Sequence, residues 1–211
     1  MLREFCAENL TNVQKALKAG AQRVELCDDL SVGGVTPSDT VIAEAVELIH
    51  EHGAMVMVMV RPRGGDFAYD GHEIEAMEHT VSVVRKLGAD GVVFGCVRDA
   101  RLDEAATARL ARAASGLDMT FHMAFDEIDP IHQPEALRRL AELGFSRILT
   151  HGGPLSQPID ACLGHLRDLV LLAGDAISIM PGGGVTWQNA EHISAELGVS
   201  EVHGTKIVHW E

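Results

Sequence analysis

The sequence lacks the features that mark secreted, membrane-spanning and nucleic-acid-binding proteins. Its four cysteines are widely spaced and form no CxxC pair, so neither a disulfide framework nor a structural zinc site is indicated. The longest apolar run, residues 54–60, is far too short to span a bilayer. Positive charge is scarce: the formal net charge is -14, which disfavours binding to nucleic acid or to an anionic membrane surface.

The start of the chain also has no basic stretch followed by an apolar run, so we expect a cytoplasmic protein. Its 211 residues, of which 46% are hydrophobic and 23% are charged, suit one globular domain with a substantial core. We therefore expect a single domain over residues 1–211.

A repeated pattern gives the main indication of the fold: a helical segment, then a glycine, then a short run rich in β-branched residues. The glycines of the seven copies are Gly20, Gly53, Gly88, Gly116, Gly144, Gly174 and Gly198. Their spacing of roughly 24 to 35 residues is the size of one βα unit. With an opening strand over residues 2–7, the pattern predicts eight strands joined by helices, an α/β fold of the (β/α)8 TIM-barrel type.

The end of the predicted barrel is unusual. After the eighth strand only residues 204–211 remain, too few for a full closing helix. We expect a partner subunit to cover the apolar groove left there, with Ile207 and Trp210 as anchors, and hence a homo-oligomer. An open doubly wound sheet is the alternative fold, but the loop after the first strand contains no GxGxxG motif.

Charged and thiol side chains recur on one face of the first two strands. Glu4 and Cys6 share a face of strand one, and Arg23, Glu25 and Cys27 share a face of strand two, with apolar residues between them. Parallel strands covered on both faces are normally apolar throughout, so we expect the polar face to line the barrel. Two interpretations stay open: a satisfied ion-pair network, or direct contact with a ligand.

Cys6 and Cys27 end adjacent strands on this inward face, where neighbouring backbones run about 4.8 Å apart. Their thiols are therefore candidate ligands of one metal ion, and soft thiolates select soft ions such as Cu(I). The alternative is two buried, inert cysteines. Met55, Met57 and Met59 alternate along strand three and are expected to fill the interior.

Loops after several strands offer groups that bind anions. Arg61, Arg63 and Asp66 place two guanidinium groups beside an acid after strand three; the alternative is that these groups pair with one another and with neighbouring acids. Glycines whose backbone amides suit a phosphate follow strands six and seven, and tight barrel corners are the alternative role for them. These glycines are Gly152, Gly153, Gly182, Gly183 and Gly184.

Glu25 and His122 are the candidate acid–base residues. His122 lies at the end of strand five with Asp126 four residues further on, an arrangement suited to proton transfer or metal ligation. One hypothesis is therefore a barrel enzyme that acts on a small anionic or phosphorylated substrate. Glu25 or His122 would be its base, and Arg61 and Arg63 would clamp the anion.

Several of these motifs together resemble the CutC copper homeostasis family. They are ELC at 25–27, GGVTPS at 33–38, RPRGGDF at 61–67, GADGVVFG at 88–95, TFH at 120–122, RILT at 147–150 and MPGGGV at 180–185. The resemblance covers essentially the whole chain. It implies a cytoplasmic TIM-barrel protein, often oligomeric, that is linked to copper tolerance and binds Cu(I) through cysteines matching Cys6 and Cys27.

The chain departs from the family pattern at the expected mouth of the barrel. Met123 stands where the family typically has an arginine, and His151 stands where a serine usually precedes the glycine pair. The ending at 202–205 also lacks the usual serine-rich sequence. Two functions therefore remain as hypotheses: a Cu(I)-binding homeostasis protein, and an enzyme with a small anionic ligand.

Overall fold

Helices and strands alternate along the chain, of which the computed structural model describes residues 1–210. In order, the elements are β1 (Leu2–Glu8), α1 (Val13–Lys18), β2 (Arg23–Cys27), the 3-10 helix η1 (Leu30–Val32), α2 (Asp39–Glu51), β3 (Met55–Met59), α3 (Gly71–Leu87), β4 (Gly91–Phe94), β5 (Val97–Arg98), β6 (Arg101–Leu102), α4 (Glu104–Ala113), β7 (Asp118–Phe121), the 3-10 helix η2 (Met123–Glu127), α5 (Gln133–Glu142), β8 (Arg147–Thr150), α6 (Ile159–Ala173), β9 (Ser178–Pro181), α7 (Ala190–Leu197) and β10 (Glu201–Gly204).

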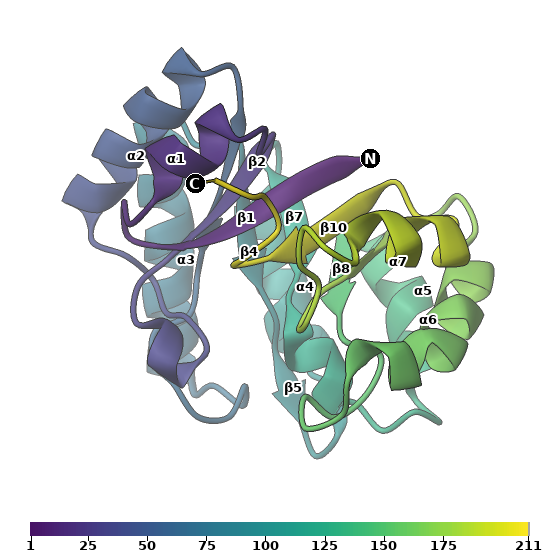
Figure 1. Cartoon of the computed structure of the whole chain (residues 1–211). Helices are drawn as coiled ribbons and strands as arrows, with labels where there is room; N and C mark the ends of the chain where they lie inside the picture. The colour runs from purple at the N-terminus through teal and green to yellow at the C-terminus, as the bar shows by residue number, and fades with distance from the viewer. Residues whose placement is uncertain (211) are drawn as a thin grey trace.

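Within residues 1–210, eight parallel strands form one sheet in the order β10-β1-β2-β3-β4-β7-β8-β9. The two end strands, β9 and β10, lie next to each other without a backbone ladder, so the barrel is nearly closed. Helices surround the strands on the outside (Figure 1). The predicted (β/α)8 barrel is confirmed. The short antiparallel hairpin of β5 and β6, which the glycine pattern did not predict, is inserted after β4.

Alternate residues of each strand belong to two separate apolar regions. Outward residues such as Val24, Val58 and Phe121 pack with the helices in the larger core. A smaller cluster inside the barrel contains Cys6 and Cys27. Because side chains alternate across a strand, this division sends the charged and thiol residues inward.

Helix α3 shows how local sequence sets the ends of an element. At its start, the side chain of Asp70 accepts hydrogen bonds from the amides of His72 and Glu73, and the Glu73 carboxylate accepts one from the Asp70 amide. At its end, Gly88 has φ 84°, the left-handed conformation that glycine adopts without strain. The glycine that follows this helical segment in the sequence is therefore explained by the left-handed conformation at the end of the helix.

The chain after β10 covers the barrel itself. No helix follows β10 within residues 1–210, as the sequence predicts. Ile207 is fully buried in the main core, and the Trp210 ring packs edge-on against Phe5 of β1 at 5.8 Å between centroids. We expected a partner subunit to cover this groove, with Ile207 and Trp210 as anchors. That expectation is wrong, because the chain's own residues after β10 cover the groove.

No helix within residues 1–210 combines the length and the apolar character needed to cross a membrane.

The interior leaves no space for a side chain at Gly91 of β4. A Cβ there would overlap the Asp118 backbone oxygen and the Met57 side chain. We expect Gly91→Ala to lower the free energy of unfolding by about 1–3 kcal/mol, the usual cost of overpacking. Gly164→Ala in α6 meets nothing within 4 Å and should raise it by about 0.5–1 kcal/mol. Urea unfolding followed by circular dichroism measures both; equal effects would contradict the packing described.

Candidate functional site

The strand register places the inward side chains in rows across the barrel. Cys6 lies beside Glu25 on the neighbouring strand, and Glu25 lies beside Met57 on the next. Glu4 lies beside Arg23, one row closer to the amino-terminal ends of the strands. The interior therefore has two rows of side chains. The charged row includes Glu4 and Arg23, and the thiol row, which includes Cys6 and Glu25, lies nearer the barrel mouth.

A continuous chain of ion pairs occupies the charged row. Arg23 pairs with Glu4 and also reaches Glu201 at 2.7 Å. Arg147 pairs with Glu201 at 3.2 Å and with Asp118 at 2.7 Å. Each of these buried or half-buried charges has a partner of opposite sign, as burial requires. The sequence allowed an ion-pair network of Glu4, Arg23, Glu25 and Arg61. Glu4 and Arg23 pair as expected, Arg61 donates to backbone oxygens instead, and the network extends to three further strands.

His203 of β10 connects the charged row to the thiol row. Its Nδ1 lies 2.8 Å from Glu4, and its Nε2 lies 3.7 Å from Glu25. Burial alone would lower the pKa of His203, but the proximity of Glu25 and a hydrogen bond with Cys6 raise that pKa well above its usual range. Burial would raise the pKa of Glu4, yet Arg23 and His203 lower it to about 2. His203 is therefore a buried cation and Glu4 a buried anion at neutral pH.

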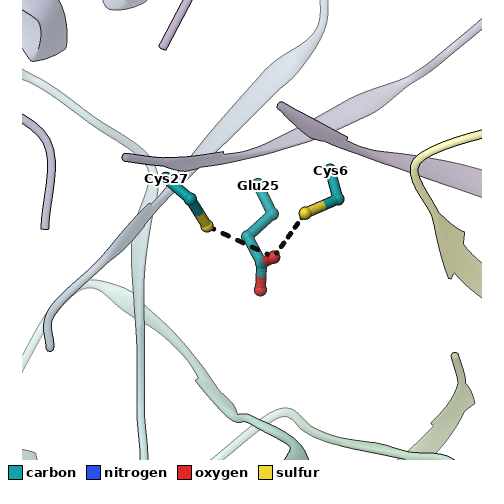
Figure 2. A group of neighbouring side chains, drawn as sticks. All are labelled: Cys6, Glu25 and Cys27. Carbon is teal, nitrogen blue, oxygen red and sulfur yellow. Dashed lines mark hydrogen bonds between the residues drawn. The ribbon is translucent and has the colours of Figure 1, made fainter. Parts of the chain in front are cut away.

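The two inward cysteines point their thiols at one carboxyl group. Cys6 Sγ lies 3.3 Å from Oε2 of Glu25, and Cys27 Sγ lies 3.6 Å from the same oxygen. Figure 2 shows the thiols approaching this oxygen from two sides while the other oxygen points away from them. Ligand atoms of the three residues all lie within 4.8 Å of one another. Cys6 and Cys27 are thus brought together, as their positions in the sequence predict.

The two thiols differ in acidity because Cys6 faces His203. A hydrogen bond from Cys27 outweighs burial and, together with His203, lowers the pKa of Cys6 well below its usual range. The same hydrogen bond, with burial, raises the pKa of Cys27 well above its usual range. Burial is also the main reason that the pKa of Glu25 is raised. In this cluster a negative charge is therefore favoured on Cys6 over Cys27, and burial disfavours it on Glu25.

Further sulfur atoms surround the cysteines. Met57 and Met59 belong to the same buried cluster, whereas Met55 is 37% exposed and takes no part in it. Thiolate and thioether sulfurs are the donors that soft ions such as Cu(I) prefer. The chemistry of these donors therefore fits Cu(I), and Cys6 and Cys27 are the residues that would hold it.

A cavity of about 530 Å³ opens at the carboxy-terminal ends of the strands. Cys6, Glu25 and His203 line it, whereas Cys27 is covered by the loop at Gly34, where an added Cβ would lie 3.1 Å from the thiol sulfur. Apolar side chains in the lining are Leu30, Met59, Phe67, Met123, Leu149, Leu155 and Val185. The thiol row is therefore reached from the mouth through Cys6.

Arg61 lines the mouth cavity, but most of its guanidinium is engaged by the protein. Its terminal nitrogens donate to the backbone oxygens of Val32 and Gly34, both at 2.9 Å, and of Gly65 at 2.8 Å. Its Nε is buried and has no partner within residues 1–210. Arg61 therefore holds the loops after β2 and β3 in place and has one free donor.

Arg63 and Asp66 lie outside the lining of the mouth cavity. The Arg63 guanidinium binds Glu73 at 2.5 Å and Asp66 at 3.0 Å. These contacts match the alternative that the sequence left open, in which the loop's charges pair with one another. The structure does not bring Arg63 together with Arg61 to form a clamp.

His122 is a neutral hydrogen-bond donor at the cavity wall. Burial, followed by the charge of Arg61, lowers the pKa of His122 to about 3. Its Nδ1 accepts a hydrogen bond from the Ala124 amide at 3.2 Å, so the proton is on Nε2. That Nε2 is buried without a partner within residues 1–210. His122 is therefore suited to donate a hydrogen bond from Nε2, and its low pKa makes it a poor base.

Asp126, four residues after His122, has a positioning role. Its carboxylate accepts hydrogen bonds from the Thr150 hydroxyl at 2.5 Å, from the His151 amide at 2.9 Å and from the Gly152 amide at 3.1 Å. It therefore orders the loop after β8. It makes no hydrogen bond to His122 within the part of the chain described.

The glycines predicted to bind an anion fall into two groups. Gly152 and Gly153 line a separate cavity beside the mouth, and the Gly152 amide is taken by Asp126. Gly182 donates its amide to the Thr150 backbone oxygen at 3.0 Å. Gly183 and Gly184 line the mouth cavity, and within residues 1–210 their amides donate to no protein group.

Two of the departures from the family pattern, Met123 and His151, have different surroundings. Met123 lines the mouth cavity, so an apolar side chain replaces a cation there. The ring nitrogens of His151 lie 3.2 Å from the Gly182 oxygen and 3.1 Å from the Gln157 oxygen, which fixes the two loops to each other. Lys206, which sequence reasoning missed because it follows the last strand, also lines the cavity.

A model of the CutC family matches residues 1–208 of the chain. A protein of Enterococcus faecalis named as a family protein CutC is 47% identical over 209 residues, which cover 99% of this chain and 100% of the relative. A Streptococcus pyogenes protein of the same name is 46% identical over 209 residues, with the same coverage of both chains.

A solved structure gives the same result in three dimensions. The crystal structure of a candidate copper homeostasis protein CutC from Streptococcus agalactiae superposes with a TM-score of 0.96 at 45% identity. The superposition covers 99% of this chain and 100% of that one.

The charged row predicts how the free energy of unfolding depends on pH. Glu4→Gln should lower the free energy of unfolding near neutral pH by roughly 3 kcal/mol, because Arg23 and His203 lose their shared anion. The folded pKa of Glu4 is about 2 against an ordinary 4.5, so its contribution is complete above 4.5 and is lost as pH falls toward 2. Urea unfolding at neutral and acid pH should show the two proteins converging in acid.

Glu191→Gln is the matched control for this measurement. Glu191 pairs with Arg3 at 2.6 Å, but its side chain is 75% exposed. An exposed ion pair contributes below about 1 kcal/mol. Equal losses in the two variants would contradict the role of the buried row.

Proposed function

The chain belongs to the CutC family, and we propose that it is a cytoplasmic copper homeostasis protein that holds Cu(I) through the thiolates of Cys6 and Cys27. The observation that carries this proposal is the approach of both thiols to one oxygen of Glu25 inside the barrel. The description of the Streptococcus agalactiae neighbour as a candidate copper homeostasis protein supports the choice of metal.

The two thiols differ in pKa, so they would become thiolate ligands in two separate deprotonation steps. Cys6 supplies a thiolate readily, because the hydrogen bond from Cys27 and the contact with His203 lower its pKa. Cys27 has a raised pKa and must lose its proton to become a ligand. Since only the thiolate binds metal, the affinity of this pair for a soft ion should increase with pH.

The depth of the site suits an ion that must be kept from water and oxidants. Cys27 is completely buried, and Cys6 is 8% exposed at the floor of the mouth cavity. An ion held between them would be reached from the mouth past Cys6. The buried cation His203 offsets the negative charge of the thiolates, which lowers the cost of ionising them in the interior.

An enzyme acting on a small anionic or phosphorylated substrate is the second candidate function. One observation favours it: the mouth cavity, at about 530 Å³, is of the size that holds a small organic ligand and exceeds what a single ion requires. In that function His122 would donate a hydrogen bond to the substrate, and the raised pKa of Glu25 would suit it to transfer a proton.

A homo-oligomer remains part of the proposal, at a surface other than the tail. Leu172 is 50% exposed and Ile131 is 77% exposed, and both line a shallow groove beside α5 and α6. Apolar side chains gathered at such a groove favour a contact between subunits. Sedimentation equilibrium should give a mass above the 22.7 kDa of one chain; a monomer at all concentrations would remove this part of the proposal.

Copper binding is tested by comparing two double variants that each remove two buried cysteines. We expect Cys6→Ala/Cys27→Ala to abolish stoichiometric Cu(I) binding, because it removes both thiolates. Cys96→Ala/Cys162→Ala removes the buried cysteines outside the cluster and should leave binding unchanged. Competition with a chromophoric Cu(I) chelator under anaerobic, reducing conditions measures the stoichiometry. Equal binding by the two variants would contradict the proposal.

A further inference from the structure

We propose that the mouth cavity binds a small phosphorylated metabolite whose other end carries a carbonyl or carboxylate group. This inference rests on the second candidate function, and it is independent of copper. Two sets of hydrogen-bond donors in the cavity lining lead to it, one on the loops after β9 and β10 and one on the residues that follow β3 and β7. Each set lacks partners of its own within residues 1–210.

The loops after β9 and β10 form the phosphate end. They follow the seventh and eighth strands of the barrel, where TIM barrels commonly bind phosphate. Gly183 and Gly184 have φ values of 69° and 105°, and their amides donate to no other group within residues 1–210. Backbone amides freed in this way cradle phosphate oxygens.

Lys206 adds a cation to the same rim. It is exposed at the cavity mouth, and its backbone oxygen accepts a hydrogen bond from the Trp187 amide at 2.8 Å. A parallel bridge between Thr186 and Lys206 holds the chain end beside the glycine loop. The rim therefore combines free amides with one positive charge, the usual complement of a phosphate group.

Glycine is required at position 183 by close contacts. A Cβ there would lie 2.7 Å from Leu155, 2.9 Å from His151 and 3.0 Å from Met123. The loop therefore lies tight against the neighbouring loop while its amides remain unpaired. Such a close approach of backbone, without a hydrogen bond to satisfy it, is expected where a ligand supplies the acceptor.

The wall opposite supplies a second set of polar atoms without partners. Arg61 Nε, His122 Nε2 and Glu25 Oε1 are buried, and they have no hydrogen-bond partner within residues 1–210. An unsatisfied buried polar atom is destabilising, so three in the lining of one cavity are unusual. All three belong to residues that are at least nine-tenths buried and that line the mouth.

Two of these three atoms, Arg61 Nε and His122 Nε2, are hydrogen-bond donors. Arg61 is always charged, and the His122 tautomer places its proton on Nε2. Oε1 of Glu25 adds a third buried polar atom without a partner to the same wall, within residues 1–210. Two buried donors without partners match a ligand group that offers acceptor oxygens, which is a carbonyl or a carboxylate.

Phe67 fixes the direction of two of these donors. The Arg61 guanidinium lies over its ring at 4.7 Å from the centroid, and the His122 ring lies 4.9 Å away. The remaining lining is largely apolar, so a short carbon chain suits the space between the two ends better than a sugar with many hydroxyl groups.

Isothermal titration calorimetry on the copper-free wild-type chain tests the inference with phosphoglycolate, which carries both end groups. Inorganic phosphate and glycolate each carry one of them. We expect saturable binding of one phosphoglycolate per chain, at least about tenfold tighter than either single-ended probe. Absence of saturable binding, or equal binding of inorganic phosphate, would overturn the inference.

Variants assign the two ends. Lys206→Gln should weaken phosphoglycolate binding by about tenfold or more, whereas Lys86→Gln, the same change on the exposed last turn of α3, should leave it unchanged. His122→Phe should weaken phosphoglycolate but not inorganic phosphate, and circular dichroism confirms that the variant folds. Unchanged binding in both Lys206→Gln and His122→Phe would place the ligand elsewhere and overturn the inference.

The experiments distinguish failure of this inference from failure of either candidate function. If Cys6→Ala/Cys27→Ala loses Cu(I) but retains phosphoglycolate, the ligand site is independent of the metal site, as expected. If copper binds and phosphoglycolate does not, this inference fails while the copper proposal stands. If phosphoglycolate binds but no phosphorylated carbonyl compound is converted, the enzyme function fails and the ligand site stands.

Discussion

The structure depends on one constraint, which is that polar side chains inside a small barrel must find partners among the side chains around them. Eight strands enclose an interior that side chains fill, so water cannot solvate a charge there. The charged row meets this requirement with alternating signs: Glu4 pairs with Arg23, Arg23 with Glu201, and Glu201 with Arg147. This row closes the amino-terminal end of the barrel and supports what lies above it.

His203 connects the charged row to the candidate site. It is held by Glu4 on one side and faces the thiol row on the other. A fixed buried cation makes a thiolate at Cys6 acceptable in the interior, and Cys27 contributes a hydrogen bond to it. The site's capacity to bind a soft metal therefore depends on Glu4, which no metal touches. The unpaired donors of the mouth are the exception to the pairing rule, which is why they indicate a ligand.

Sequence reasoning was most successful where a property repeats along the chain. Glycines before β-branched runs mark seven of the eight barrel strands, and the alternation of polar and apolar residues places Cys6 and Cys27 inside. Periodicity carries this information because a strand fixes which residues share a face. His203 shares the inward phase with Glu201 on β10, so the same signal identifies it.

Loops and the chain end were less predictable, because their contacts join segments far apart in sequence. Nothing in the RPRGGDF motif shows that Arg61 turns to the carbonyls of another loop while Arg63 turns outward to Glu73. The spacing of His122 and Asp126 suggests a pair, yet Asp126 binds amides after β8. The tail is short, and only its fold shows that Trp210 covers Phe5 of its own chain.

X-ray absorption spectroscopy at the copper edge tests the central claim most directly, because it identifies the atoms bound to the metal. For the wild-type chain loaded with one equivalent of Cu(I), sulfur neighbours alone are predicted in the inner coordination shell. A shell of nitrogen and oxygen, or a sulfur shell that persists after both Cys6 and Cys27 are replaced, would contradict the account.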